Sequence, residues 1–79
     1  MAKARVFVTL KKSVFDPQGK TIHDALLGMG YSGVQAVRQG KFFEVELQGS
    51  AEQARATVEE ISRKVLANPV IESFRVEVE

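Results

Sequence analysis

The sequence predicts an α+β fold in which two helices lie on one face of a four-stranded antiparallel sheet. Three observations support this: several short runs alternate between apolar and polar residues, two longer runs repeat apolar residues at helical spacing, and turn or capping residues separate the runs. The order along the chain is strand, helix, strand, strand, helix, strand. That order is typical of the split βαβ arrangement, whose two right-handed crossovers put both helices on the same side of the sheet.

The first expected strand spans residues 4–10, where apolar and other residues alternate with period two. This alternation is typical of a strand with one face in the core and the other toward solvent. The two faces carry Val6, Val8 and Leu10 on one side and Arg5, Phe7 and Thr9 on the other.

The first helix should begin at Asp16 and Pro17. The aspartate carboxylate accepts from free N–H groups of the first turn, and proline at the first helical position gives up no bonded donor. Gly19 is unfavourable inside a helix by roughly 1 kcal/mol relative to alanine, so we expect a backbone reason for its presence. Gly30 can close the helix in the left-handed conformation. The apolar stripe expected to face the core is Ile22, Ala25, Leu26 and Met29.

Residues 34–48 are expected to form a β-hairpin that turns at Gln39–Gly40. Gly40 supplies the positive φ that a tight turn requires, either in a two-residue type I′ turn or beside a bulge. With a two-residue loop, Val37 faces Phe42 across the two strands. One apolar side of the hairpin then consists of Val34, Ala36, Phe43, Val45 and Leu47.

The second helix should begin at Ser50, which has the spacing of a capping box with Gln53. It should end at Asn68–Pro69, because the residue before a proline is disfavoured in the α region. A last strand is expected over residues 70–79. The stripe of this helix that faces the core is Ala54, Val58, Ile61 and Val65.

Together these elements predict one ferredoxin-like domain, residues 1–79, with the first and third strands in the centre of the sheet. Phe7, Val37 and Phe42 would point away from the helices, onto an uncovered face. This patch predicts a self-association surface, although scattered surface hydrophobic residues are the simpler explanation. A chain this short buries only about 60% of its unfolded surface, so a partner subunit would stabilise it.

Composition and charge exclude several classes of function. Eleven Lys and Arg residues against ten Asp and Glu residues give a net charge of +1, which makes no electrostatic case for a nucleic-acid partner. The chain has no cysteine, hence no disulfide framework or thiolate metal site, and this favours a cytoplasmic protein. No apolar run has the length of a signal peptide or a membrane span.

The sequence contains little that predicts catalysis. His23 is the only histidine and has no second ligand or nucleophile near it, so we expect neither a metal site nor a catalytic role. The run Gly28-x-Gly30-x-x-Gly33 closes a helix, whereas the dinucleotide fingerprint opens one.

Two binding functions remain as alternatives. A small regulatory ligand-binding domain has the same topology, but only analogy of fold supports it. An RNA-recognition domain would stack bases on Phe7 and Phe42, and the outward carboxylates of Glu44 and Glu46 disfavour that function because they repel a phosphate backbone.

Three segments carry a specific combination of motifs: VFVTLKKSVFDPQG at residues 6–19, VRQGK at 37–41 and VLANPVIESFRVEVE at 65–79. In this order and spacing they resemble the PurS family, the small subunit of bacterial and archaeal phosphoribosylformylglycinamidine (FGAM) synthase. Phe15 and Val65 stand where the family is expected to have leucines. Both are conservative apolar exchanges.

The resemblance implies a subunit, without catalytic residues of its own, of the ligase that makes the amidine of formylglycinamide ribonucleotide in de novo purine synthesis. A synthetase subunit, PurL, and a glutaminase subunit, PurQ, carry the chemistry. They use the ATP, Mg and glutamine, so no cofactor is expected on this chain. The family member is expected to act as a homodimer that bridges PurQ and PurL and supports ammonia transfer between them.

Six positions match the family's motifs and are candidates for contact with the other subunits. The helix start is expected to be exposed and rigid, with free N–H groups for a partner's carboxylate or a phosphate, although starting the helix explains these residues equally well. The hairpin tip is expected to project charged side chains, as the rim of an interface does, or simply to form a soluble turn. The candidates are Asp16, Pro17, Gln18 and Gly19 at the helix start, and Arg38 and Lys41 at the hairpin tip.

Overall fold

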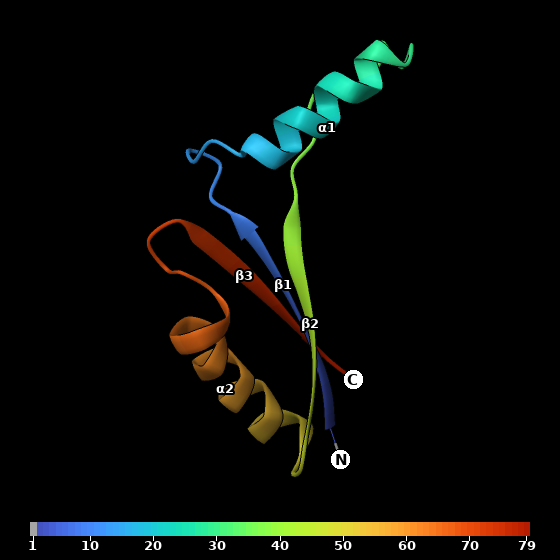
Figure 1. Cartoon of the computed structure of the whole chain (residues 1–79). Coiled ribbons are helices and arrows are strands. Elements are labelled where there is room, and N and C mark those ends of the chain that lie inside the picture. The colour runs from blue at the N-terminus through green and yellow to red at the C-terminus, as the bar shows by residue number, and fades with distance from the viewer. Residues whose placement is uncertain (1) are drawn as a thin grey trace.

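The computed structural model describes residues 2–79 of the chain. Its elements, in chain order, are β1 (Ala2–Leu10), α1 (Pro17–Gly28), β2 (Gly40–Leu47), α2 (Ala51–Ile61), the π-helical turn η1 (Ser62–Leu66) and β3 (Glu72–Val78). The strands form one antiparallel sheet in the order β2-β1-β3, with α2 lying against it (Figure 1). β1 is therefore in the centre of the sheet, as the ferredoxin-like arrangement predicts, whereas β2, also expected in the centre, is an edge strand within this chain.

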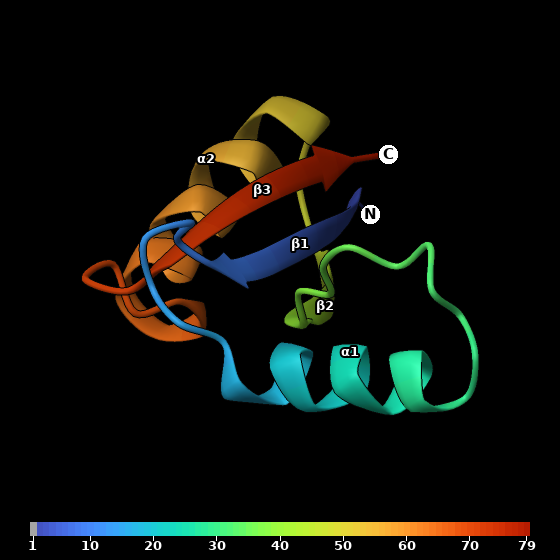
Figure 2. The same ribbon diagram turned by 90° about the horizontal axis from the view of Figure 1, so that it is seen from above.

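The core lies between α2 and one face of the sheet (Figure 2). β1 contributes Ala4, Val6 and Val8, and α2 contributes Val58, all with no exposed surface. These valines are the inward residues of the predicted alternation, because side chains two apart in a strand share a face. Side chains of the two flanking strands pack against these core residues and are themselves half buried: Phe43, Val45, Leu47, Phe74, Val76 and Val78.

The second helix changes its geometry midway. The capping box at Ser50 is formed as predicted: its hydroxyl accepts from the Gln53 N–H, and the Gln53 side chain accepts from the Ser50 N–H. At Ser62 the hydroxyl donates to the Val58 carbonyl at 2.7 Å, and a π turn follows. The extra residue of that turn rotates the rest of the helix, so Leu66 packs inward. The prediction that Val65 faces the core is wrong, since 76% of it is exposed.

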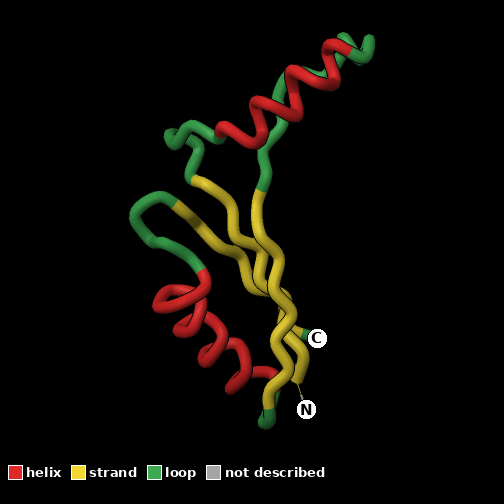
Figure 3. The backbone as a smooth tube through the Cα atoms, in the orientation of Figure 1, coloured by secondary structure: helices red, strands yellow, loops and turns green. Residues whose placement is uncertain are grey.

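The first helix begins as predicted but does not lie on the sheet. Asp16 is its N-cap, Pro17 is its first residue, and Gly30 has a φ of 98° beyond its end. Figure 1 and the tube in Figure 3 show α1 standing beyond the end of the strands, while α2 alone covers the sheet. Only Gly19 of α1 is buried. The prediction that both helices cover one face is therefore wrong for α1.

Residues 34–39 do not form the first strand of the predicted hairpin. They continue from β2 as extended chain and lead to α1 (Figure 3). Gly40 is not among the positive-φ glycines of the described chain, which are Gly30 and Gly49, so it makes no hairpin turn. It is needed for close packing instead: a Cβ on Gly40 would stand 2.4 Å from the Val8 carbonyl oxygen of the neighbouring strand.

The molecule is consequently long and thin. Its Cα radius of gyration is 15.9 Å and its extents are 49 × 24 × 14 Å, whereas a compact domain of this length has a radius of gyration of roughly 12 Å. The fold class is α+β and ferredoxin-like, as predicted, with three paired strands and one covering helix within this chain. We call residues 17–38, which project from the sheet, the α1 arm.

Candidate functional site

The α1 arm is attached through the carboxylate of Asp16. Its Oδ1 accepts from the N–H of Gly19 at 2.9 Å, and its Oδ2 accepts from the N–H of Gln39 at 2.8 Å. Asp16 is only 5% exposed. The N–H of Gln39, followed by that of Gly19, holds the pKa of this carboxyl below its usual value, because hydrogen bonds stabilise the charged form. One side chain thus joins the two ends of the arm.

Arg38, at the end of the arm that leads into β2, adds hydrogen bonds to this attachment. Its Nη2 donates to the carbonyls of Lys11 at 2.9 Å, Val14 at 3.1 Å and Leu10 at 3.4 Å. These carbonyls belong to the end of β1 and the turn that leads to α1. The planar guanidinium suits several acceptors at once, which a lysine ammonium does less well.

Gly19 explains why the arm approaches so closely. A Cβ on this residue would lie 2.2 Å from the Val37 carbonyl oxygen and 2.8 Å from Oδ2 of Asp16. The helix and the extended segment therefore meet at a point where only glycine fits, which is the expected backbone reason for Gly19. We call Asp16, Gly19, Arg38 and Gln39 the root cluster of the arm.

The candidate partner-binding residues at the helix start differ in their exposure to solvent. Pro17 and Gln18 are exposed, but Asp16 and Gly19 are buried, so the helix start is only partly the exposed one that was predicted. The Gly19 N–H is already bonded to Asp16, which leaves less room for an external anion.

The two hairpin-tip candidates also differ from the prediction, because no hairpin tip is formed. The guanidinium of Arg38 is bonded to backbone of its own chain, and Lys41 pairs with Glu72 at 3.2 Å. Contact of any of the six candidates with another subunit remains a prediction.

The uncovered face of the sheet is less apolar than the sequence predicts. The rings of Phe7 and Phe42 lie 5.1 Å apart, and the guanidinium of Arg75 stands 4.5 Å above the Phe7 ring. This packing occupies Phe7 and argues against bases stacking there, whereas Phe42 remains 51% exposed. The same face also carries ion pairs, including Lys3–Glu44 and Arg5–Glu79.

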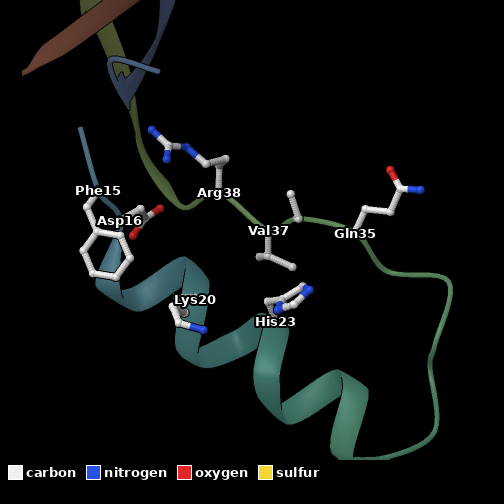
Figure 4. A pocket seen from close by; sticks show the side chains of 8 residues that line it. Phe15, Asp16, Lys20, His23, Gln35, Val37 and Arg38 are labelled. Atoms are coloured by element: carbon white, nitrogen blue, oxygen red, sulfur yellow. The ribbon is translucent and has the colours of Figure 1, made fainter. Parts of the chain in front are cut away.

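Val37 is not beside Phe42 within the chain, so the structure does not bring all three self-association candidates together. Val37 lies over α1 near His23, at an open hollow of about 220 Å³ between the helix and residues 35–38 (Figure 4). His23 Nδ1 lies 3.1 Å from an oxygen of Asp24. The lining of the hollow contains no serine, threonine or cysteine side chain that His23 could activate as a nucleophile.

Five large apolar side chains are exposed on the α1 arm and directly before it, where sequence reasoning placed a buried helix face. In the residues described, few other regions expose so many large apolar side chains. The inward stripe predicted for α1 is wrong within a single chain, since most of it faces solvent. The exposed large apolar side chains of this region, with their exposed fractions, are Phe15 at 67%, Ile22 at 42%, Leu27 at 41%, Met29 at 71% and Tyr31 at 57%.

Residues 2–79 contain no cluster of three or more His, Cys, Asp or Glu side chains able to hold a metal ion. Within the same range, every helix is too short or too polar to span a bilayer. The surfaces that remain as functional candidates are therefore the α1 arm, the exposed edge of β2 and the uncovered sheet face.

Comparison with known proteins identifies the family. The family model described as "PurS: Phosphoribosylformylglycinamidine (FGAM) synthase" matches residues 3–79. The FGAM synthase subunit PurS of Bacillus subtilis is 47% identical over 79 residues, which span all of this chain and 94% of that protein. PurS of Methanocaldococcus jannaschii is 40% identical, over 100% and 96% of the two chains.

Solved structures agree with the sequence relatives. A crystal form of B. subtilis PurS has a TM-score of 0.90 at 47% identity, covering 100% of this chain and 99% of that one. A chain in the structure of PurLQS from Thermotoga maritima has a TM-score of 0.81 at 29% identity, with the same coverage. This chain belongs to the PurS family, whose members are subunits of FGAM synthase in purine biosynthesis.

Proposed function

We propose that this chain is the noncatalytic scaffold subunit of FGAM synthase, and that as a homodimer it bridges the glutaminase PurQ and the synthetase PurL and supports ammonia transfer between them. The observation that carries the proposal is the α1 arm, a helix whose apolar side chains are exposed in the single chain. Apolar surface of this kind favours association. The described residues show no catalytic geometry that would support a reaction of their own.

The assembly of a relative supports the choice of partners. The T. maritima structure is a PurLQS complex, and its matching chain spans the whole of this one. In our proposal PurL and PurQ bind the ATP, Mg and glutamine, and this chain binds no cofactor. Gln18 and Lys41 offer exposed polar side chains beside the arm root, and Pro17 offers an exposed apolar ring. We place the complex in the cytoplasm, a proposal that rests on the cysteine-free sequence.

Reconstitution with purified PurL and PurQ from the same organism tests the bridging role. We expect glutamine-dependent FGAM formation to require this chain, and ammonium chloride to support FGAM formation by PurL without PurQ or this chain. The expected difference arises because a bridge is needed only when ammonia travels between two subunits. Glutamine-dependent activity that is undiminished when the chain is left out would contradict the proposal.

The homodimer has its own test. Light scattering coupled to size-exclusion chromatography at micromolar concentration should give the mass of two chains. Replacing both Phe7 and Phe42 by glutamate tests whether the uncovered sheet face contributes to the dimer interface. Glu60→Gln, on the exposed side of α2, is the control. A strictly monomeric wild-type protein would overturn the homodimer.

A further inference from the structure

Beyond the α1 arm, the β2 edge and the uncovered sheet face, the chain exposes a further apolar surface on the loop between η1 and β3. Val70 is 77% exposed and Ile71 is 38% exposed, and Pro69 beside them is exposed as well. The loop lies on the side of the sheet away from β2, because β3 is the other edge strand. These side chains take no part in the core between α2 and the sheet. They are apolar surface that association with another molecule can bury.

Asn68 holds the backbone of this loop in one conformation. Its side-chain Oδ1 accepts from the Val70 N–H at 3.0 Å. Its carbonyl accepts from the N–H groups of Ile71 at 3.2 Å and Glu72 at 2.7 Å. The Glu72 carboxylate in turn accepts from the Asn68 N–H at 2.7 Å. Because the loop is ordered in advance, binding through Val70 and Ile71 would lose little further backbone freedom.

The turn after β1 places two lysines next to this loop. The Lys11 N–H donates to the Ile71 carbonyl at 2.9 Å, and the two segments lie side by side (Figures 1 and 2). Lys11 and Lys12 are both exposed, and within residues 2–79 neither has an ion-pair partner. We call Lys11, Lys12, Val70 and Ile71 the loop surface.

The positive charge around the loop surface is not neutralised by the chain itself. Residues 11–15 and 61–73 hold four lysine and arginine residues against one carboxylate, whereas the rest of the chain holds seven against nine. The one carboxylate, Glu72, is occupied by the Asn68 N–H and by Lys41 at 3.2 Å, and only 11% of its side chain is exposed. Acidic side chains that complement this surface must therefore come from another molecule.

Two other occupants fit the loop surface less well than an acidic protein. A twofold contact between two copies of it would bring four lysines together, and like charges that face each other across an interface are unfavourable. A nucleic acid would satisfy the lysines, but Val70 and Ile71 offer no aromatic ring on which a base could stack.

We propose that the loop surface docks onto a protein subunit that presents an apolar socket bordered by Asp and Glu side chains. Val70 and Ile71 fill the socket, and the two lysines pair with its acidic rim, which is the usual arrangement of an apolar interface centre inside a polar border. This inference rests on the proposed bridging function and adds a surface through which the chain would hold PurL or PurQ. None of its residues is among the candidates for self-association.

Val70→Glu tests the apolar centre of the loop surface. Binding of purified PurL and of purified PurQ is measured separately by biolayer interferometry, with the chain immobilised through a terminal tag and with ATP, Mg and glutamine present. We expect at least about tenfold weaker binding of one of the two subunits, because an ionised carboxylate would enter an apolar socket among acidic side chains. Thr57→Glu, at an exposed position of α2, adds the same group elsewhere and should bind as wild type.

Lys12→Glu tests the charged rim. We expect binding of the same subunit to weaken about three- to tenfold at low ionic strength, and the difference from wild type to shrink as salt screens the charges. Lys3→Glu makes the same change of charge at the other end of β1 and should bind as wild type. Circular dichroism melting and light scattering establish that each variant folds and keeps the wild-type mass.

Three results would overturn the docking proposal. The first is wild-type affinity of both Val70→Glu and Lys12→Glu for both subunits. The second is a folded Val70→Glu protein of lower mass than wild type, which would assign the surface to a contact between copies. The third is RNA that binds wild type but not Lys12→Glu while affinity for the subunits is unchanged. In each case the proposed function stands if glutamine-dependent FGAM formation still requires the wild-type chain, and it fails if that activity does not.

Discussion

The sheet with α2 and the α1 arm are held by different interactions. The sheet body is stabilised by burial: Val6, Val8 and Val58 have no exposed surface. The arm buries only one of its helical residues, Gly19, and is fixed by hydrogen bonds at its root. Burial is non-directional, whereas hydrogen bonds to a carboxylate set an orientation.

This difference shows how a chain of 79 residues can present an apolar helix to a partner. The root cluster sets the direction of the arm without using its apolar side chains. Those side chains remain exposed in the single chain, so an interface built on them, as proposed above, would not compete with the fold for the same residues. The following variants test this division of roles, from the largest expected effect to the smallest.

Val58→Ala should destabilise the body most. It removes two methyl groups from a fully buried position, and we expect a loss of about 2–3 kcal/mol in the free energy of unfolding. Val65→Ala is the matched control in the same helical segment, because Val65 is 76% exposed and should change little within one chain. Urea denaturation measures both. Equal effects would mean that the π turn does not rotate Val65 outward.

Gly19→Ala should act on the arm. The added Cβ would lie 2.2 Å from the Val37 carbonyl oxygen, so the helix must move. We expect the free energy of unfolding to fall by about 1–3 kcal/mol. Gly28→Ala is the control on the same helix: its Cβ meets nothing within 4 Å, and it should stabilise by up to about 1 kcal/mol. Thermal melting and the dimer mass are the measurements. A Gly19→Ala protein with wild-type melting and mass would contradict the tight contact at the root.

Asp16→Asn should make stability less dependent on pH. The folded state holds the pKa of Asp16 below its ordinary value of about 3.9, so its contribution is present above about pH 4 and is lost as the pH falls through the lower folded value. The melting temperature of the variant should lie below wild type at pH 6, and the gap should narrow by pH 3. Asp24→Asn, at an exposed carboxylate of the same helix, should have a smaller effect. A gap that stays constant with pH would mean that the charge of Asp16 is not what holds the arm.

Arg75→Met should have the smallest effect. The guanidinium stands 4.5 Å over the Phe7 ring on an exposed face, where such a contact is worth about 0.5–1 kcal/mol. Arg63→Met, at an exposed position of η1, is the control and should be near neutral. Chemical denaturation measures the free energy of unfolding of both variants. A loss well above 1 kcal/mol would mean that the uncovered face carries more of the fold than the geometry indicates.

Local features were predictable from the sequence because their causes lie within a few residues. The alternation of β1, the Asp16 cap with Pro17, and the capping box at Ser50 each depend on neighbours in the chain. The motifs at residues 6–19, 37–41 and 65–79 also identified the family. Local pattern and steric preference therefore predicted most of the elements and the fold class, and the three motifs predicted the PurS relationship.

Tertiary contacts decided the features that pattern alone predicted wrongly. Gln39–Gly40 has a turn-like sequence, yet its backbone stays extended because the Gln39 N–H donates to the carboxylate of Asp16 and the neighbouring Arg38 donates to the Lys11 carbonyl. Both acceptors are distant in the chain. Val65 fits the period of an α-helix, but the Ser62 hydroxyl and the π turn change that period. The sequence determined the helices and three of the four expected strands, whereas the placement of α1 and of residues 34–39 depends on long-range polar contacts. These contacts act only once the chain has brought residues 16 and 39 together.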